Sequence, residues 1–536
     1  MSRFVHDLER DALPDVCDSD VCVIGSGPVG LTIARALAER HRSVTIFERG
    51  PLRAAEPAAD EECVFDRRVY RGTTTGRAFG AGGTSALWGG QLLPVRPEDL
   101  NQRQPIGAPA WPLQYSELAR YFESLGNTLQ VVGGGFNLDS LQPMRHPLTE
   151  LRWGEWTPRL SKWLPFGRRN LYTALETELA ASQCVEAYVN AQVSEWELRG
   201  GTDGRRIIEA RARSANGRPL RARARVYVIC AGALESARCV LELNEAAGGL
   251  GSGVAEYTGR FLHDHLSVRL GSFEIKNYPE FERLFAPVFV GTTMRSLRME
   301  LDNGFLEKEG LPRLYAHFVS EAPLDSGFAI LRDVLRGLQK RNFQSAYRKA
   351  WGIPKAMPEV ASILFNRYFH RRLSFSRQGT VHLHCDFEQA PLHENRVYLG
   401  SSVNGRARPL HIDWDLGGNI KSVLSAVQTV FARFWGANAL DRIARLEPVD
   451  LSTDAPLQPN NLYDIYHPAG TTRMSSDPQR GVVDPNLRIH GTSNAFVAGS
   501  SVFPSMGAAN PTFTAMALGL RLAEFIDHAL SGEQYP

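Results

Sequence analysis

The 536-residue chain carries 60 lysines and arginines against 58 aspartates and glutamates. Its length exceeds what one simple core holds, which predicts two packed domains, and its balanced charge argues against nucleic acid as a partner. No apolar run reaches the roughly 20 residues that a membrane span needs, and the polar leader Met1–Asp20 lacks the apolar core of a signal peptide. The seven cysteines form no CxxC pair, which predicts reduced thiols in a cytoplasmic protein.

A strand that ends in a glycine-rich turn is the first predicted element. Residues 21–24 are apolar and lead into Gly25, Gly27 and Gly30, and the apolar spacing of residues 31–37 predicts a helix buried along one face. The first glycine permits a tight turn, the second lets a pyrophosphate approach the backbone, and the third lets helix and strand pack closely. Because free N–H groups at a helix start attract phosphates, this turn predicts a dinucleotide site.

A second predicted strand, residues 43–47, ends in Glu48. A carboxylate about 20 residues past such glycines can accept hydrogen bonds from an adenosine ribose, and it repels a 2′-phosphate, which disfavours NADP. At this point of the chain NAD and FAD both stay open.

Residues 62–100 are rich in glycine, most densely at 77–90. Glycine at this density destabilises helix and strand alike. A flexible linker rarely carries aromatic residues such as Phe79 and Trp88 beside paired hydroxyls. The segment is therefore predicted to be a loop folded tightly against a ligand.

Predicted strands and polar turns alternate over residues 186–230, and the last apolar run, 226–230, leads directly into residues 231–238. Strand, small-residue turn and helix follow one another here as they do near the N-terminus. This segment is either a second turn that faces a phosphate or ribityl group or an ordinary strand–helix connection.

Residues 266–450 lack the pattern of strand, small-residue turn and helix. Within them, residues 381–388 alternate polar and apolar side chains. As a strand, this segment places four polar residues on one face: His382, His384, Asp386 and Glu388. That face is either the wall of a substrate cavity or a solvated surface, and both interpretations are favoured over a metal site. The run His263-Asp264-His265 is predicted to be a buried polar turn, with no metal role.

From residue 332 to residue 377 the basic residues far outnumber the two acids, Asp333 and Glu359. Aromatic and cationic side chains mix most densely at residues 365–372. The segment is either a solvated helical face or a dock for an anionic partner, an electron acceptor or a membrane surface.

The C-terminal segment returns to the strand–turn–helix pattern. A predicted strand ends at Gly499, and the run Asn510-Pro511-Thr512 precedes a predicted helix over residues 514–528. The run Tyr466-His467-Pro468 comes before that strand. An NAD domain made at the N-terminus needs no late return of the chain, so this pattern favours FAD.

In this order, the motifs resemble those of the glucose–methanol–choline (GMC) family of flavin oxidoreductases. The resemblance covers the N-terminal nucleotide fold and five later stretches: residues 80–90, the Trp111-Pro112 helix, residues 231–238, residues 259–265, and residue 467 to the end. The regions between match loosely, as at residues 395–397.

The resemblance implies an α/β fold. A Rossmann-like FAD-binding domain would be built from discontinuous segments, beside an α+β substrate domain with an antiparallel sheet, and the flavin ring would lie at their interface. The FAD-binding segments implied are 16–105, 186–265 and 455–536. The substrate or cap region would be 106–185, and the substrate domain 266–454.

The resemblance also assigns cofactor contacts by position. Residues at the first turn and the second strand end would hold the ADP half: Gly25, Ser26, Gly27, Gly30, Glu48 and Arg49. Residues near the adenine and along the cofactor would be Val193, Ala231 and Gly232. Residues beside the flavin and its ribityl chain would be Thr84, Ser85, Trp88, Gly89, Gly499, Asn510, Pro511 and Thr512.

Two departures from the family pattern affect the chemistry. Some members attach flavin through a histidine of the glycine loop, but Ala86 and Leu87 offer no nucleophile here, which predicts noncovalent FAD. The second catalytic position is histidine or asparagine in the family, and here it is Asn510. His467 would accept the hydroxyl proton as a neutral imidazole, Asn510 would orient the substrate, and the flavin would receive the hydride.

The expected activity is FAD-dependent oxidation of a CH–OH group in a small alcohol. The motif style resembles the branch that oxidises sugars, polyols and sterols, and the polar face with His382 and His384 as candidate substrate contacts favours a sugar, cyclitol or glycoside. The alternatives are a non-redox lyase that keeps FAD as a scaffold, oxidation of a sterol-like alcohol, and an NAD dehydrogenase. Oxygen, a quinone or a protein all stay open as the electron acceptor.

Overall fold

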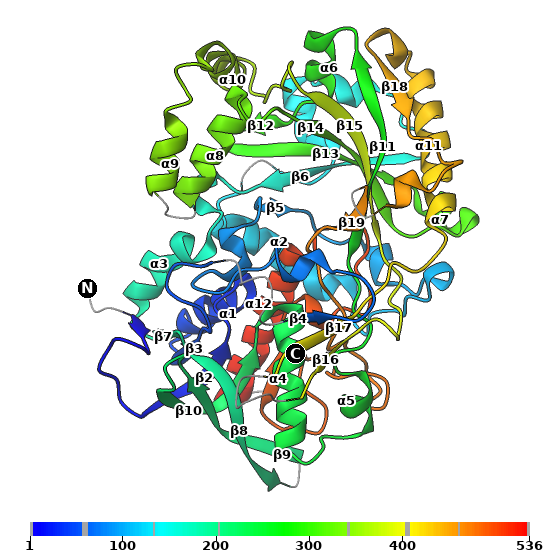
Figure 1. Cartoon of the computed structure of the whole chain (residues 1–536). Coiled ribbons are helices and arrows are strands. Elements are labelled where there is room, and N and C mark those ends of the chain that lie inside the picture. The colour runs from blue at the N-terminus through cyan, green and yellow to red at the C-terminus, as the bar shows by residue number, and fades with distance from the viewer. Residues whose placement is uncertain are drawn as a thin grey trace.

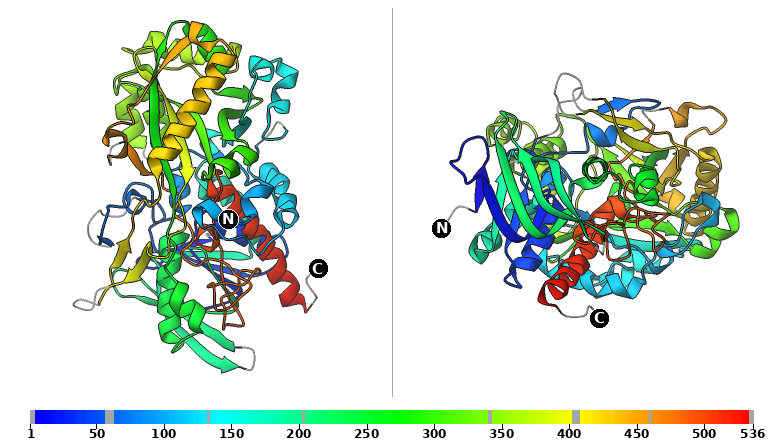
Figure 2. Two further views of the ribbon diagram at one scale, coloured as in Figure 1. Left: turned by 90° about the vertical axis from the view of Figure 1, so that its right-hand side faces the viewer. Right: turned by 90° about the horizontal axis from the view of Figure 1, so that it is seen from below.

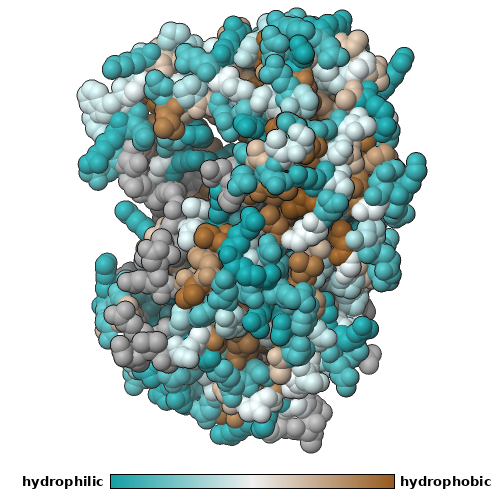
Figure 3. Space-filling model, turned by 45° about the vertical axis from the view of Figure 1, so that its right-hand side comes forward, coloured by the Kyte–Doolittle hydropathy of each residue, from teal (hydrophilic) through white to brown (hydrophobic). Residues whose placement is uncertain are grey.

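Two β-sheets, one above the other, organise the computed structural model (Figure 1). The structure describes residues 4–55, 63–131, 134–201, 204–339, 343–401, 408–458 and 461–532. The lower half is built on the sheet that contains β2 (Val16–Ile24), and the upper half on the sheet that contains β15 (Thr380–Glu388). On the face shown in Figure 3, apolar side chains gather at the waist where the halves meet.

The sheet of the lower half is parallel at its centre and antiparallel at one edge. Its strands run in the order β1 (Val5–Asp7), β7 (Val185–Val189), β3 (Val44–Phe47), β2, β10 (Pro219–Ile229), β9 (Gly204–Arg213) and β8 (Gln192–Gly201). The pairs from β1 to β10 are parallel, and β9 and β8 add as a hairpin. Near the C-terminus, β20 (Ala495–Val497) pairs in parallel with β10. Strands from both the N-terminal and the C-terminal parts of the chain therefore build this sheet.

The helices of the lower half pack tightly on one another. They are α1 (Pro28–Ala38), α2 (Tyr115–Thr128), α3 (Leu171–Ser182), α4 (Gly232–Ala246), α5 (Ser252–Tyr257) and α12 (Pro511–Ser531). α1 packs against α12 and α3, and α2 packs against α12. A Cβ at Gly519 of α12 would lie 3.1 Å from Val29 and 3.3 Å from Ile33 of α1, so this glycine permits the close approach.

The sheet of the upper half is antiparallel throughout its described pairs. Its strands run in the order β18 (Ala444–Pro448), β11 (His265–Ile275), β15, β14 (Leu314–Glu321), β13 (Thr293–Leu301), β6 (Trp156–Trp163) and β5 (Gln91–Leu92). β12 (Val288–Val290) pairs with β13, and β19 (Leu462–Asp464) pairs with β11.

One long helix forms the core of the upper half with this sheet. The helices here are α6 (Tyr278–Phe285), α7 (Asn303–Glu309), α8 (Gly327–Gln339), α9 (Phe343–Ala350), α10 (Met357–Phe369) and α11 (Ile420–Ala437). α11 crosses the upper half in the left view of Figure 2. Its residues Val423, Val427 and Phe431 recur every four positions and are buried, as an amphipathic helix requires, and the ring of Phe431 lies 6.2 Å from that of Phe273 in β11.

This architecture confirms the predicted fold class: a Rossmann-like domain made of discontinuous segments, beside a domain with an antiparallel sheet. The chain, however, crosses between the halves more often than the predicted boundaries allow. In the segment 106–185, α2 and α3 pack on helices of the lower half, and only β6 joins the upper sheet. β5 and β19 were assigned to FAD-binding segments and pair in the upper sheet.

A third, small sheet shows the same crossing. β16 (Arg396–Leu399) and β17 (Leu410–Asp413), from the predicted substrate domain, pair with each other and with β4 (Cys63–Phe65) of the first segment. Apolar periodicity marks the buried face of a strand but carries no information on which distant strand it meets, so these pairings could not be predicted from the sequence.

No helix in the described ranges is long and apolar enough to cross a membrane. The seven cysteines, which all lie within the described ranges, form no disulfide with one another.

A buried charged contact joins the two halves at the end of β15. Glu388 Oε2 lies 2.7 Å from Arg103 Nη2, and the backbone N–H groups of Gly507 and Arg313 donate to the same carboxylate at 2.9 and 3.1 Å. Burial on its own raises the pKa of Glu388, but the Arg103 guanidinium and the N–H donors outweigh burial and hold the pKa below its ordinary value. Glu388 is therefore an ionised group that depends on its partners.

We expect Glu388→Gln to lower the free energy of unfolding by about 3–5 kcal/mol, because it leaves Arg103 buried without its counter-ion. The matched control is Glu155→Gln, which breaks an exposed contact of 2.7 Å to Arg433 and should cost less than about 1 kcal/mol. Urea unfolding of both variants measures the difference. Equal losses of unfolding free energy in the two variants would show that the buried contact contributes no more to stability than the exposed one.

Candidate active site

A cavity opens in the lower half where the parallel strands end. Its walls include Ile24, Phe47 and Cys230, which follow or end β2, β3 and β10. Three helices begin at this cavity, α1 at Pro28, α4 at Gly232 and α12 at Pro511. Ligands of open α/β sheets bind at the carboxyl ends of the strands, and helix N-termini attract anionic groups such as phosphates.

The glycines of the first turn fit a dinucleotide. Gly25 has φ +103, and a Cβ there would lie 2.6 Å from the carbonyl oxygen of Cys230. A Cβ at Gly30 would lie 2.1 Å from the carbonyl oxygen of Gly25. Gly27, in contrast, lines the cavity and has nothing within 4 Å of its missing Cβ. Bare backbone thus faces open space beside a helix start, as close approach of a pyrophosphate requires.

Glu48 lines the cavity and also organises the turn around it. Its Oε2 accepts hydrogen bonds from the N–H and hydroxyl of Ser26 at 2.9 and 2.8 Å. Its Oε1 accepts from the N–H groups of Gly50 and Gly80, each at 2.9 Å. The carboxylate therefore ties the glycine loop to the first turn. Its contact with a ribose stays a prediction.

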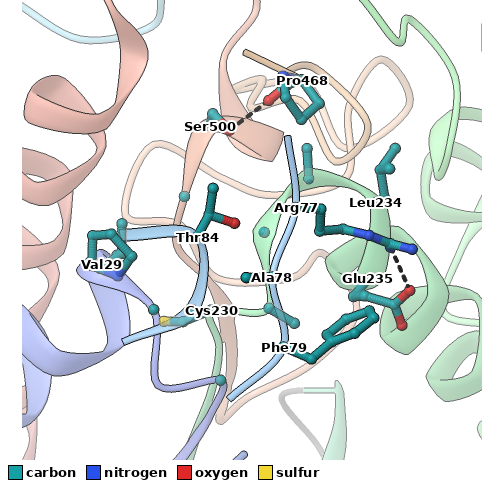
Figure 4. A pocket seen from close by; sticks show the side chains of 18 of the residues that line it. Val29, Arg77, Ala78, Phe79, Thr84, Cys230, Leu234, Glu235, Pro468 and Ser500 are labelled. Atoms are coloured by element: carbon teal, nitrogen blue, oxygen red, sulfur yellow. Dashed lines mark hydrogen bonds and ion pairs between the residues drawn. The ribbon is translucent and has the colours of Figure 1, made fainter. Parts of the chain in front are cut away.

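A charged cluster forms another wall (Figure 4). The guanidinium groups of Arg49 and Arg77 lie 4.4 and 4.7 Å from the ring centre of Phe79, and both approach Glu235, at 3.4 and 3.0 Å. Arg238 also contacts Glu235, at 2.9 Å. Burial raises the pKa of Glu235, but the three guanidinium groups outweigh burial and lower it to about 2. Only Arg49 of this cluster was among the predicted contacts.

The position of His467 depends on an unusual backbone. Tyr466, which precedes it, has φ +68, a conformation that bulky residues rarely adopt and that marks functional sites. The N–H of His467 donates to both oxygens of Asp264, at 2.9 and 3.0 Å. The Tyr70 hydroxyl donates to the same carboxylate. The buried Asp264 thus holds the imidazole at the cavity wall.

Hydrogen bonds determine which nitrogen of His467 carries a proton. His265 Nε2 lies 2.7 Å from the carbonyl oxygen of Gly507, and since a carbonyl only accepts, Nε2 of His265 is protonated. Its Nδ1 is then an acceptor, so His467 Nδ1, 3.0 Å away, donates to it. The lone pair of His467 is left on Nε2, to which Asn510 Nδ2 donates at 3.2 Å.

Both imidazoles are neutral near pH 7. Loss of solvation is the main cause that lowers the pKa of His467 to about 3, and the neighbouring His265 lowers it further while Asp386 opposes the shift. Burial also lowers the pKa of His265. A neutral imidazole can accept a proton at its unprotonated Nε2 from a ligand hydroxyl that replaces the Asn510 amide there.

Asn510 stands at the start of α12 and offers a second polar contact. Its side-chain Oδ1 is buried and has no hydrogen-bond partner within the described part of the chain. A buried amide oxygen without a partner is costly. A donor group of a bound ligand would satisfy it.

The structure brings most predicted cofactor residues to this one cavity. Its walls include Gly25, Gly27, Glu48, Arg49, Thr84, Val193, Ala231, Gly232, His467, Gly499, Pro511 and Thr512. The remaining predicted residues are not part of those walls: Ser26, Gly30, Ser85, Trp88, Gly89, Asn510, His382 and His384. Ser85 and Trp88 make internal contacts instead, with the N–H of Leu171 at 3.0 Å and the carbonyl of Arg169 at 2.6 Å.

The polar face of β15 is buried, so its interpretation as a solvated surface is wrong. His382, His384, Asp386 and Glu388 are each at most 6% exposed. Neighbouring strands supply their partners. Ser272 and Ser267 lie 2.8 and 3.3 Å from His382 and His384. The described residues contain no group of three or more His, Cys, Asp or Glu placed to hold a metal. A substrate role for His382 and His384 stays a prediction.

Sequence reasoning missed two groups of site residues. Residues 263–265 are buried as predicted, but the contact of His265 with His467 was not foreseen. The cluster of Arg77, Phe79, Glu235 and Arg238 was also missed. The density of charged and aromatic residues beside each turn, at 77–79 and 235–238, was the available signal.

Family models match two stretches of the chain that contribute walls to this cavity. Residues 391–519 match the model described as GMC oxidoreductase, and residues 20–59 match the one described as FAD dependent oxidoreductase. The chain is 37% identical to choline oxidase of Arthrobacter globiformis over 162 residues, 29% of this chain and 27% of that protein. It is 43% identical to the fructose dehydrogenase large subunit of Gluconobacter japonicus over 28% of this chain and 26% of that protein.

Two further proteins match over nearly the whole length. The 2-methyl-1,2-propanediol dehydrogenase of Mycolicibacterium austroafricanum is 22% identical over 96% of both chains. The crystal structure of pyridoxine 4-oxidase from Mesorbium loti superposes with a TM-score of 0.58 at 18% identity, over 96% of this chain and 100% of that one. The similarity to the pyridoxine 4-oxidase structure shows that the two chains share a fold. The local matches to choline oxidase and fructose dehydrogenase span about a quarter of those proteins.

We expect Gly27→Leu to weaken FAD binding by roughly 10-fold or more, since overfilling a packed site costs about 1–3 kcal/mol. Gly167→Leu is the matched control, because Gly167 also has nothing within 4 Å of its missing Cβ but lies outside the cavity walls. Flavin absorbance per protein after gel filtration, and titration of the apoprotein with FAD, measure the effect. Full FAD content in Gly27→Leu would contradict the assignment of this cavity as the FAD-binding site.

Proposed function

The chain belongs to the GMC oxidoreductase family, and from this premise we propose that it is an FAD-dependent enzyme that oxidises a CH–OH group of a small alcohol. One observation carries the proposal. A neutral His467 holds its Nε2 lone pair beside Asn510, at the wall of a cavity shaped for a dinucleotide.

The residues of the chain supply proton transfer and orientation. When bound, FAD supplies the two-electron acceptor that takes hydride from the substrate carbon. The substrate hydroxyl donates to His467 Nε2 in place of the Asn510 amide, and its proton moves to that nitrogen as the carbonyl forms. Asn510 Nδ2 donates to the substrate oxygen and orients it. His265 Nδ1 accepts from His467 Nδ1 throughout, which keeps the ring in place as it gains charge.

FAD is proposed to bind without a covalent bond. Ala86 is buried and Leu87 follows it in the glycine loop, so neither offers a nucleophile. The two thiols in the cavity wall, Cys230 and Cys239, both have a pKa raised by burial, and a protonated thiol is a poor nucleophile. The residues proposed to hold the ADP half are Gly25, Gly27, Glu48, Arg49 and Val193.

The proposed substrate is a sugar, cyclitol, glycoside or other polyol. Support comes from the relatives named for fructose and for 2-methyl-1,2-propanediol, both of which carry several hydroxyls. A sterol-like alcohol and a non-redox lyase on the same scaffold are the alternatives. The seven cysteines form no disulfide with one another, which supports a cytoplasmic location as part of this proposal.

An anaerobic absorbance scan against sugars, glycosides, polyols and sterols tests the proposed function. Bleaching of the flavin bands by one compound identifies the substrate class, and recovery in air marks oxygen as the acceptor. Bleaching that persists in air until a quinone or an electron-transfer protein is added identifies a dehydrogenase. If no alcohol bleaches the flavin, the oxidoreductase proposal fails in favour of the lyase.

We expect His467→Ala to retain FAD and to lower the rate constant of flavin reduction by at least ~100-fold, because a positioned base contributes about 10²–10⁴-fold. The control is His146→Ala, which removes a buried histidine that does not line the cavity and should leave that rate constant within a few-fold. Anaerobic stopped-flow mixing with the substrate measures both. An unchanged rate constant of flavin reduction in His467→Ala would contradict the role of His467 as the base.

The low pKa of His467, about 3, sets the pH dependence. The base is active when neutral, so the reduction rate constant should stay level between about pH 5 and pH 8 and should fall only toward the pKa. An ordinary histidine would instead cause a fall near its unperturbed pKa of about 6.5. A rate profile with that midpoint would show that His467 is solvated in the working enzyme.

Noncovalent attachment predicts that unfolding releases the cofactor. After denaturation in urea and ultrafiltration, the yellow colour should pass into the filtrate with the absorption spectrum of free FAD. Colour that stays with the denatured protein would contradict noncovalent binding.

A further inference from the structure

Three helices project from the edge of the upper half, α8, α9 and α10 (Figure 1, upper left). We call them the helical projection. Large apolar side chains of this projection and its connections are exposed: Leu338, Phe343, Tyr347, Trp351, Met357, Leu364, Phe365, Tyr368 and Phe369. Trp351, Tyr368 and Phe369 are 70%, 72% and 74% exposed. Large exposed apolar residues grouped on helices that pack against one another mark an interaction surface.

These side chains are not needed to hold the helices together. α8 packs against α9 and α10, and the contact between α8 and α9 uses small residues. A Cβ at Gly337 would lie 3.0 Å from the Cβ of Ala346. Within the projection the buried positions include Ala329, Ala346, Val360 and Ile363. Small and aliphatic residues thus face inward while the aromatic residues face out, the reverse of an ordinary surface helix.

The same surface is strongly basic. Its described basic residues are Arg332, Arg336, Arg348, Lys349, Lys355, Arg367, Arg371 and Arg372; residues 340–342 of the predicted basic segment lie outside the described residues. Its two acids are engaged within the projection or at its base. Asp333 lies 3.2 Å from Arg332 and 3.7 Å from Lys349, and Glu359 accepts from the N–H of Gly327 and the hydroxyl of Ser376.

Charge and shape together select the partner. A second copy of this chain would bring like charges together, which disfavours a dimer through this face. An anionic partner fits. The aromatic residues stand outward as pairs, Phe365 on Phe369 with ring centres 4.6 Å apart and Tyr347 against Trp351 at 6.0 Å. Protruding rings beside cations suit insertion into a fluid lipid interface, which needs no matching groove.

We infer that the helical projection docks this protein on the surface of an anionic lipid bilayer. The aromatic side chains insert at the headgroup level, and the basic side chains contact anionic headgroups. Arg367, whose guanidinium lies 3.5 Å from the ring centre of Phe289 and 5.7 Å from that of Tyr368, shows how cation and aromatic ring share this surface. The surface is distinct from the cavity and does not depend on the proposed reaction.

Sedimentation of the FAD-bound protein with vesicles tests the inference. We expect binding to vesicles of phosphatidylcholine mixed with phosphatidylglycerol, weak or no binding to phosphatidylcholine alone, and a loss of binding as salt screens the charges. Absence of binding to the mixed vesicles at low salt would overturn the inference.

Paired variants separate this surface from general effects of charge or hydrophobicity. The charge variant is Arg348→Glu with Lys349→Glu and Lys355→Glu, and its matched control is Lys308→Glu with Arg442→Glu and Arg445→Glu, all at exposed positions. The apolar variant is Phe343→Ser with Trp351→Ser and Phe369→Ser, and its control is Leu52→Ser with Val64→Ser and Val69→Ser. Flavin absorbance confirms that each variant is folded.

The two projection variants should bind mixed vesicles at least ~10-fold more weakly, since each basic residue near an anionic surface contributes about 1 kcal/mol. The two controls should bind within a few-fold of the parent protein. Equal losses in variants and controls would overturn the inference. A parent dimer that the apolar variant converts to a monomer, without any vesicle binding, would assign the surface to a second copy and would also overturn it.

Insertion of Trp351 can be followed directly. Vesicles with brominated acyl chains should quench part of the tryptophan fluorescence of the parent protein. Trp351→Phe should keep vesicle binding and lose most of that quenching. Unchanged quenching in Trp351→Phe would show that another part of the molecule inserts.

Discussion

The hydrogen bonds between residues 263–265 and residues 467–469 hold the candidate base where two halves of the molecule meet. His263 and Ala469 exchange backbone hydrogen bonds at 3.2 and 2.9 Å, and Asp264 accepts from the N–H of His467. One strand of this contact leads into β11 of the upper sheet, and the other leads toward β20 of the lower sheet. The imidazole is therefore placed by both halves, and a shift between them would move it.

Gly507 extends this constraint to the protonation state of the base. Its carbonyl accepts from His265 Nε2, and its N–H donates to Glu388 Oε2. It has φ +70, and a Cβ there would lie 2.5 Å from the side chain of Asp99, so a larger residue does not fit. The Gly507 carbonyl determines the tautomer of His265, and His265 determines that of His467. The unprotonated state of His467 Nε2 therefore follows from backbone geometry. The folded protein therefore holds His467 in the tautomer that can act as a base before a ligand binds.

The upper half contributes to two different interactions. Its sheet faces the base through the buried polar side chains of β15, while its helical projection presents aromatic and basic side chains to the surroundings. Neighbouring strands contact His382, His384 and Asp386 at 2.8, 3.3 and 3.1 Å, while His384 Nε2 and Asp386 Oδ1 have no hydrogen-bond partner among the described residues. The projection has small residues inside and aromatic residues outside, which no requirement of folding explains. Docking at a membrane would leave the cavity chemistry unchanged and would set where in the cell the substrate is met.

Local features of the cofactor site could be read from the sequence. The first turn, with Gly25 and Gly27, and the carboxylate of Glu48 depend on the conformation of neighbouring residues and on a helix start that follows at once, so their pattern along the chain is enough. The period of two over residues 381–388 likewise predicted correctly that four polar residues share a face. It could not tell solvent from protein interior, because burial depends on what the sheet packs against.

The arrangement of the base was decided by tertiary structure alone. His265 and His467 are 202 positions apart, and Arg77 and Glu235 are 158 apart. No local period encodes such contacts, since they arise only when strands of separate segments pair and bring their ends together. The sequence by itself determined the class of fold, the dinucleotide turn and the identity of the candidate base. Only the tertiary structure decided the tautomer of that base and the charged wall of the cavity, because both are set by contacts between distant segments.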